Sequence, residues 1–287
     1  GRRNWRPTLA TIPPCRNSDD ASSGWPGVTS LADRTITALL DHHDALAEIV
    51  PNLSDADLSA PSGASEWSVA QVLSHIGSGA ELTLDTHRAA IDGGPMPDPA
   101  RTQAVWDRWN EMRPHEQAAA FLEHDELLVE TFESLTVDQR QNLKITLPFL
   151  PEPVGVETTA GMRLNEVALH SWDVRVALDP MASLDEEAAE VLAEQLTGGL
   201  SFMLGFIGKT DVLDHPAVVD AGRYGLILGD TVRLTTNPLN VTASFEGPLE
   251  SFIRLIGGRL TPPHTPEKLR VSGEITLDDL RHVFPGI

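Results

Sequence analysis

The sequence predicts an α+β protein of two domains, an N-terminal antiparallel four-helix bundle followed by a smaller α+β domain. Apolar residues recur at helical spacing in long segments up to residue 178. The pair Asp179-Pro180 then interrupts the pattern, and between residues 223 and 247 apolar and polar residues alternate as they do in strands. With 287 residues, of which 41% are hydrophobic, the chain is long enough to form two cores.

We expect three regions: a disordered leader at residues 1–27, a helical bundle at 28–180 and an α+β domain at 181–287. The leader has four prolines, a run of Ser and Asp, and no periodicity of helix or strand. The boundary near residue 180 follows from the change in pattern.

The bundle is expected to contain four helices. The first spans 28–50 and stops at Pro51, and the second follows a capping box of Ser68 and Gln71 and ends near Asp92. A short amphipathic segment at 101–112 precedes Pro114, which suits the first turn of a third helix ending near residue 135. After the proline-rich segment LPFLPEP, the fourth helix spans about 157–178. Long helices with one irregular connection are typical of an antiparallel bundle.

The second domain is expected to begin with one helix at about 185–207. The segment RYGLILGDTVRLTTNPLNVTASFEG then predicts two or three antiparallel strands separated by turns at Gly-Asp, Asn-Pro and Glu-Gly. The remaining segments predict a helix in PLESFIRLIGG, a strand in KLRVSG and a terminal helix in TLDDLRHVF.

Charge and composition argue against several classes of protein. A formal charge of −21 repels phosphate backbones and anionic lipids, so we expect neither a nucleic-acid nor a membrane partner. Cys15 is the single cysteine, which excludes an intrachain disulfide and a cysteine-based zinc site and fits a reducing cytoplasm. No run of about 18 apolar residues or signal peptide is present, so a cytoplasmic location is predicted.

Three residues form a candidate metal site. Glu166 and His170 are four residues apart in the fourth helix and share one face, as does a carboxylate–imidazole half-site for a metal. His75 lies on the apolar face of the second helix and is expected to point into the same bundle interior. An intrahelical Glu–His hydrogen bond and a structural core histidine are the alternatives. Three ligands from facing helices leave a fourth position open, which is typical of catalytic zinc.

Other polar and aromatic residues have simpler interpretations. His87 is about 120° around the helix from His75 and is not expected to share its site. Trp67 and Trp172 are interpreted as core residues, and Asp173 either accepts a hydrogen bond from an imidazole or forms a surface ion pair with Arg175. His43 is the one remaining histidine that falls in the apolar stripe of the first helix. The remaining histidines are expected at the surface or at helix caps: His42, His43, His115, His124, His215, His264 and His282.

Several motifs resemble the mycothiol-dependent maleylpyruvate isomerase family, the thiol-dependent branch of the DinB-like four-helix bundles. They are WSVAQVLSH at 67–75, LPFLPEP at 147–153 and RLNEVALHSWDVR at 163–175. The segment GPLESFIRLIGGRL at 247–260 is similar to the second domain of that family, which is sterol-carrier-like. The resemblance covers about residues 28–287.

The resemblance implies a zinc ion (Zn2+) held by His75, Glu166 and His170, with mycothiol as a second cofactor bound to it as a thiolate. In an isomerase of this type the thiolate adds to a cis double bond and leaves after rotation. A family arginine that handles substrate carboxylates is matched best by Arg259, with Arg254 and Arg223 as competitors.

Different functions share these features. A mycothiol S-transferase would use the same thiol to conjugate an electrophile, a non-catalytic module would only bind metal, and a carrier would use the second domain for a small molecule or lipid. The expected partners are a small electrophilic substrate and a low-molecular-weight thiol. The chain is expected to be a monomer or a homodimer.

Overall fold

The computed structural model describes residues 29–64 and 66–286. The expected leader at 1–27, with Cys15, lies outside the described residues. None of the helices in the described part of the chain is long and apolar enough to cross a membrane.

Four long helices form the N-terminal bundle, close to the predicted positions. They are α1 (Leu31–Ile49), α3 (Val69–Asp92), α5 (Pro114–Ser134) and α7 (Val156–Leu178). The predicted capping box is present, since Ser68 Oγ accepts a hydrogen bond from the backbone of Gln71 and the Gln71 side chain accepts one from the backbone of Ser68. Pro114 lies at the first position of α5 as predicted. These local signals therefore fix where the bundle helices begin.

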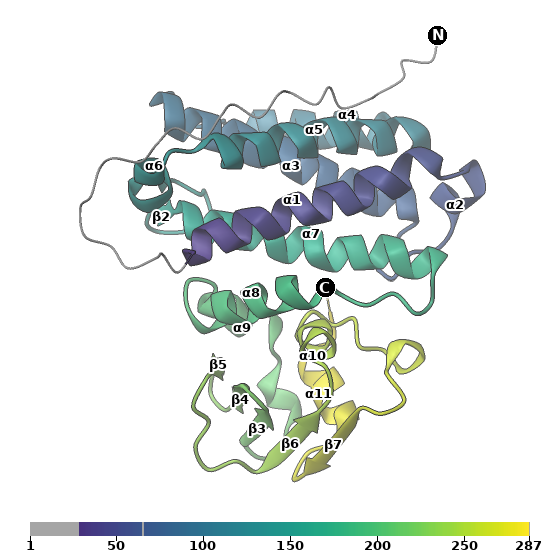
Figure 1. Ribbon diagram of the computed structural model, residues 1–287, viewed down its shortest axis with the longest axis vertical. Coiled ribbons are helices and arrows are strands. Elements are labelled where there is room, and N and C mark those ends of the chain that lie inside the picture. The colour runs from purple at the N-terminus through teal and green to yellow at the C-terminus, as the bar shows by residue number, and fades with distance from the viewer. Residues whose placement is uncertain (1–28, 65, 287) are drawn as a thin grey trace, which may run out of the picture.

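The direction of the helices follows from the connection between α3 and α5. In Figure 1, α1 and α7 run one way and α3 and α5 run the other way. The predicted short segment forms α4 (Pro99–Glu111), which carries the chain back along the bundle so that α5 follows α3 in the same direction.

Short elements that the sequence did not predict fill the connections of the bundle. They are the 3-10 turn η1 (Val50–Asn52), the helices α2 (Asp55–Ser59) and α6 (Val137–Asn142), and the antiparallel strand pair β1 (Lys144–Ile145) and β2 (Val154–Gly155). Each is six residues or shorter, so it shows too little periodicity to be recognised.

The single helix expected at 185–207 is wrong. The structure has α8 (Glu186–Thr197) and α9 (Ser201–Ile207), separated by Gly198, Gly199 and Leu200. Consecutive glycines weaken a helix because their backbone is freer in the unfolded chain, and the backbone N–H of Leu200 bonds back to Gln195 to make the turn.

The second part of the chain contains a five-stranded sheet in the order β5-β4-β3-β6-β7. Its strands and the elements around it are η2 (Thr210–Val212), β3 (Ala217–Ala221), β4 (Tyr224–Leu228), β5 (Val232–Thr235), β6 (Ala243–Glu246), α10 (Leu249–Ile256), η3 (Pro262–His264), β7 (Arg270–Gly273) and α11 (Leu277–Val283). The antiparallel strands expected in residues 223–247 are confirmed for β4 and β5. Strand β3 was not predicted, and β6 pairs in parallel with it and not with β4 or β5. The strand expected in KLRVSG is β7, which pairs antiparallel with β6.

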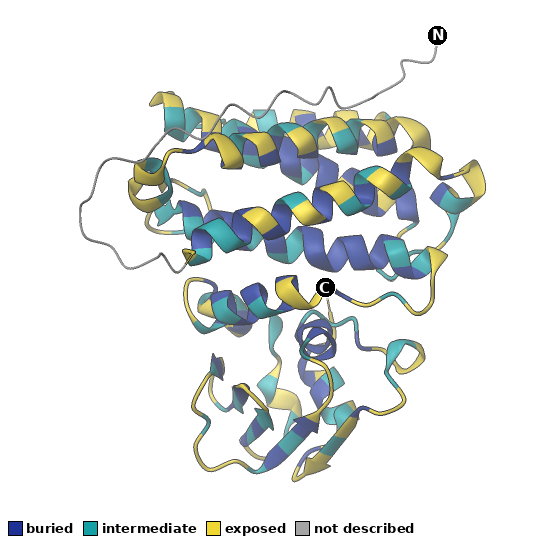
Figure 2. Cartoon of the chain, viewed as in Figure 1, coloured by how far each residue is buried: buried dark blue, intermediate teal, exposed yellow. Residues whose placement is uncertain are grey.

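Helix α8 lies between the bundle and the sheet and contacts α1 and α7 on one side and α10 and β5 on the other. One continuous apolar cluster runs from the bundle through α8 to the sheet. As a result α7, the helix that carries the candidate site, is buried along most of its length (Figure 2). The domain division at residue 180 stays a prediction.

Candidate metal centre

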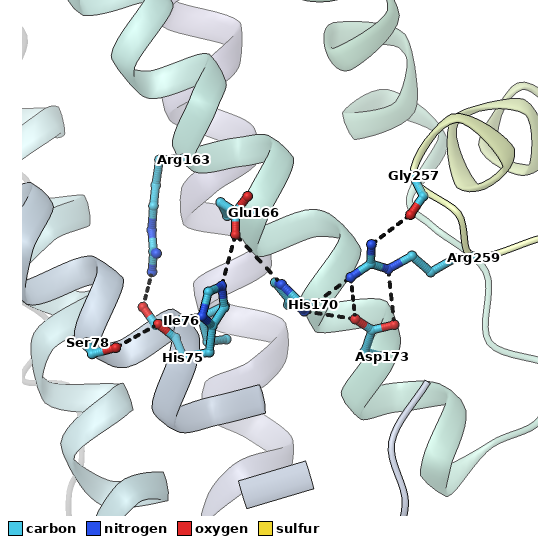
Figure 3. Close-up of polar contacts among 9 residues, drawn as sticks. All are labelled: His75, Ile76, Ser78, Arg163, Glu166, His170, Asp173, Gly257 and Arg259. Atoms are coloured by element: carbon cyan, nitrogen blue, oxygen red, sulfur yellow. Dashed lines mark hydrogen bonds and ion pairs between the residues drawn. The ribbon is translucent and has the colours of Figure 1, made fainter. Parts of the chain in front are cut away.

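The three predicted ligand residues lie together between α3 and α7 (Figure 3). Nε2 of His75 is 3.1 Å from Oε2 of Glu166, and Nε2 of His170 is 3.7 Å from the same oxygen. One ligand atom from each residue lies within 4.8 Å of the other two. The structure thus brings together residues 91 positions apart in the chain.

This donor set fits a zinc ion. Two imidazole nitrogens and one carboxylate oxygen are common zinc ligands, and three protein ligands leave a coordination position for another molecule. The His75 and Glu166 side chains are 43% and 46% exposed, whereas His170 is 10% exposed. The cluster is therefore closed on the His170 side and accessible on the other.

Glu166 is held in its charged form. Desolvation alone would raise its pKa, but the hydrogen bond with His75 and the charges of His170, His75 and Arg163 lower the pKa of Glu166 to about 2. A deprotonated carboxylate is the form that binds a metal.

Asp173 orients His170. Its carboxylate accepts a hydrogen bond from Nδ1 of His170 at 2.8 Å and is fully buried. With the proton on Nδ1, the lone pair of Nε2 faces Glu166, as metal coordination requires. The alternative surface ion pair with Arg175 is wrong, because Asp173 is buried and Nε of Arg175 donates to Ser171 instead.

Arg259 reaches this site from the second half of the chain. Its Nη2 and Nε lie 3.0 and 3.4 Å from the two carboxylate oxygens of Asp173, and Nη1 donates to the carbonyl of Gly257 at 2.7 Å (Figure 3). The other candidate arginines lie elsewhere. Arg254 is buried against Glu250 and the ring of Trp172, and Arg223 pairs with Glu190.

Trp67 lies over the histidines and is not a core residue, so that prediction is wrong. Its ring centroid is 5.0 Å from that of His75 and 6.0 Å from that of His170, and the side chain is 37% exposed. The tryptophan immediately precedes the N-cap of α3, so its ring turns back over the first turns of that helix. Trp172, in contrast, is buried in the core as predicted.

Two histidines expected at the surface are buried. His42 and His43 are both buried, and Nδ1 of His43 lies 3.0 Å from a carboxylate oxygen of Asp125 in the bundle. Of the other five, His115, His215 and His282 are exposed as predicted, and His124 and His264 are partly buried. His87 is not part of the ligand cluster, as predicted, but it is buried.

Asp125 and Arg163 were missed by the sequence reasoning. Nη2 of Arg163 donates to Asp125 at 2.7 Å and to the carbonyl of Ile76, the residue after His75, at 2.9 Å. The signal available in the sequence was a charged residue within the apolar stripe of a helix, Asp125 in α5 and Arg163 in α7. This buried pair ties α5 and α7 to the backbone that carries His75.

A pocket of about 900 Å³ opens beside the candidate metal centre, and His75 and Glu166 form part of its wall. Most of the rest of the wall is apolar and comes from α3, α4, α7, α9 and the loop at 147–149. The site therefore consists of three ligand residues next to a large apolar pocket.

The fold and the site define a protein with an N-terminal helical bundle and a C-terminal sheet, in which the bundle carries a two-histidine, one-carboxylate cluster. Residues 39–175 match the family model described as the mycothiol maleylpyruvate isomerase N-terminal domain. The matched segment includes His75, Glu166 and His170, so the bundle that carries the cluster is similar to the N-terminal domain of that family.

Two solved structures have the same fold. One is a crystal structure of the mycothiol-dependent maleylpyruvate isomerase and the other is a histidine-to-alanine mutant of it. Each superimposes with a TM-score of 0.60 at 14% sequence identity, over 85% of this chain and 94% of the other. No protein among the curated ones matches the sequence.

Proposed function

We propose that the protein is a zinc- and mycothiol-dependent enzyme of the maleylpyruvate isomerase type. The observation that carries the proposal is the convergence of His75, Glu166 and His170 on one point with an accessible side. The match to the N-terminal domain of mycothiol maleylpyruvate isomerase supports the thiol cofactor.

The cofactors would supply the nucleophile. A zinc ion with a single carboxylate ligand retains positive charge and stabilises the thiolate of a bound thiol, which can add to a cis double bond and be eliminated after rotation about the resulting single bond.

The residues of the chain would hold and orient the reactants. His75, Glu166 and His170 provide the ligand atoms, and Asp173 keeps the proton of His170 on Nδ1. Arg259 is proposed to bind a substrate carboxylate as the catalytic arginine, because its guanidinium lies next to His170, with Nη2 3.5 Å from Nδ1. Asp173 and the carbonyl of Gly257 hold that guanidinium in place.

A second candidate is a mycothiol S-transferase, which uses the same thiol but releases the conjugate. The apolar pocket beside the site favours it, since conjugation suits many apolar electrophiles. A metal-binding module without catalysis is less favoured, because structural zinc sites normally have four protein ligands. The partners under either enzymatic function are a small electrophile and a low-molecular-weight thiol, and a reducing compartment such as the cytoplasm keeps that thiol reduced.

The first prediction concerns the metal. Purified protein should contain about one zinc per chain, and His75→Ala or His170→Ala should lose it because a site with two ligands binds zinc weakly. Elemental analysis measures this, with His282→Ala at an exposed histidine as the control. Full zinc retention in both ligand variants would contradict the assignment. The zinc-loaded enzyme should also isomerise maleylpyruvate once mycothiol is added, and the His170→Ala variant should not.

A further inference from the structure

The pocket next to the candidate metal centre has walls of a particular chemistry. Large apolar side chains line it from several elements: Met96, Trp106, Leu147, Phe149, Met162 and Met203. Trp106 and Phe149 are 48% and 65% exposed. Exposed aromatic side chains that continue into an apolar pocket are typical of sites for apolar ligands.

The wall offers no free positive charge among the described residues. Arg163 is the only cation on it, and its charge is balanced by Asp125 at 2.7 Å. His87 is bonded at both ring nitrogens, to the carbonyl of Thr83 and the hydroxyl of Thr159, and burial lowers the pKa of His87. Apart from the proposed metal, the described residues of the wall give a dicarboxylate no uncompensated cation to offset its loss of hydration.

Arg163, a residue of the wall, has a buried polar atom without a partner among the described residues. Nε of Arg163 is buried and has no hydrogen-bond partner in the described part of the chain. A buried donor without a partner costs free energy, and a carbonyl oxygen of a ligand would relieve that cost. Arg259 does not line this pocket and lies on the other side of the ligand cluster (Figure 3).

We infer that this pocket binds the substrate and that the part of the substrate within it is an uncharged, apolar or aromatic body attached to an α,β-unsaturated carbonyl. A carboxylate, where the substrate has one, lies outside this pocket on the Arg259 side of the ligand cluster. The inference rests on the proposed thiol chemistry at the adjacent cluster. The thiolate sulfur forms a bond to the β-carbon, the π electron pair moves to the α-carbon, and that carbon takes a proton. Reversal after rotation gives the trans isomer, and release before reversal gives a thioether. Neither course needs an oxidant or a reductant.

The experiment compares two cis substrates with the zinc-loaded full chain and mycothiol. The neutral aromatic ketone cis-4-phenylbut-3-en-2-one should have a kcat/KM about tenfold or more above that of maleylpyruvate, a dianion, each corrected for its uncatalysed reaction with the thiol. A higher kcat/KM for maleylpyruvate would overturn the inference.

Variants test whether the substrate binds in this pocket. Met162→Lys places a cation in the pocket and should raise KM for the ketone about tenfold, whereas it should raise kcat/KM for maleylpyruvate, whose carboxylates it attracts. Met181→Lys, at a methionine that is 85% exposed and outside the pocket, should leave both unchanged. If Met162→Lys does not fold, Trp106→Lys at the exposed rim serves the same purpose. An unchanged KM for the ketone in the folded pocket variant would overturn the location.

A binding measurement separates this inference from the proposed function. The neutral fluorophore N-phenyl-1-naphthylamine should bind the zinc-loaded protein without thiol and be displaced by the ketone. Displacement in the absence of any turnover would support the pocket and contradict the thiol chemistry. Turnover of maleylpyruvate without any binding of fluorophore or ketone would support the thiol chemistry and contradict the assignment of the pocket.

Discussion

Asp173 and Trp67 surround the two histidines of the candidate metal centre without supplying a ligand atom. Asp173 fixes the proton of His170 and receives Arg259, while the ring of Trp67 covers both imidazoles. Groups of this kind restrict the orientation of ligands and so raise the affinity for a metal.

Replacing Asp173 with Asn should weaken zinc binding about 10- to 100-fold, because the amide no longer balances Arg259 and holds His170 less firmly. Competition with a chelator measures the affinity. Asp211→Asn, at an exposed aspartate, is the matched control. Equal affinities in the two variants would show that Asp173 has no part in the centre.

His43, Asp125 and Arg163 form a buried charged group that should make stability depend on pH. Burial lowers the pKa of His43, but the hydrogen bond and charge of Asp125 prevail and raise that pKa above 6.5. Burial raises the pKa of Asp125, but the hydrogen bond with His43 and the charge of Arg163 prevail and lower that pKa below 3.8. The contribution of His43 is thus full below pH 6.5 and is lost as the pH rises through its folded pKa, and that of Asp125 is lost on acidification.

The free energy of unfolding should therefore fall in the wild type as the pH rises above about 6.5 and through the raised pKa of His43. His43→Gln cannot titrate and should remove most of this slope, even if the variant is less stable throughout. Urea unfolding at several pH values measures both. His282→Gln, at an exposed histidine, should keep the wild-type slope. A slope unchanged by His43→Gln would mean that other groups cause it.

At the scale of elements, the packing of α3 on α5 depends on one glycine. A Cβ at Gly77 would lie 2.3 Å from Cη2 of Trp109 and 3.0 Å from the backbone of Phe121. Helices approach this closely only where one of them lacks a side chain. The register of α3, and with it the position of His75 two residues earlier, depends on this contact.

Gly77→Ala should lower the free energy of unfolding by about 1–3 kcal/mol, because the added methyl overlaps a buried ring. Gly205→Ala is the control, since that glycine is also helical and a Cβ there meets nothing within 4 Å. Alanine is the better helix former, so the control should be neutral or slightly stabilising. Denaturant unfolding compares the two, and a neutral Gly77→Ala would show that the bundle can relax at this point.

Elements were predictable where a local signal marks their ends. Ser68 with Gln71 and Pro114 mark helix starts by hydrogen bonds and a fixed φ angle, which act within one turn. Strand β3 was not predicted. Its parallel partner β6 is more than 20 residues away in the chain. Strands that pair over that distance share no turn or local sequence pattern that predicts the pairing.

At the scale of the whole molecule, the bundle and the sheet share a core through α8. Leu192 of this helix is fully buried in the cluster that includes residues from both parts. Two parts of a chain that share an apolar core unfold together, because the unfolding of one part exposes the buried apolar residues of the other to water.

Calorimetry should accordingly show one unfolding transition. Leu192→Ala should lower the stability of the whole molecule by about 2–5 kcal/mol and keep the transition single. Leu239→Ala removes the same atoms from a leucine that is 68% exposed and should have little effect. Two transitions, with only one of them shifted by Leu192→Ala, would show that the parts are independent.

The sequence by itself determined the helices of the bundle, the face that His75, Glu166 and His170 occupy, and the likeness to the family, because periodicity, caps and motifs are local properties. Only the tertiary structure decided that Arg259 meets Asp173, that Trp67 covers the histidines, that His42 and His43 are buried, and that an apolar pocket adjoins the site. These relations join residues from different elements, and their distances are set by how the helices pack.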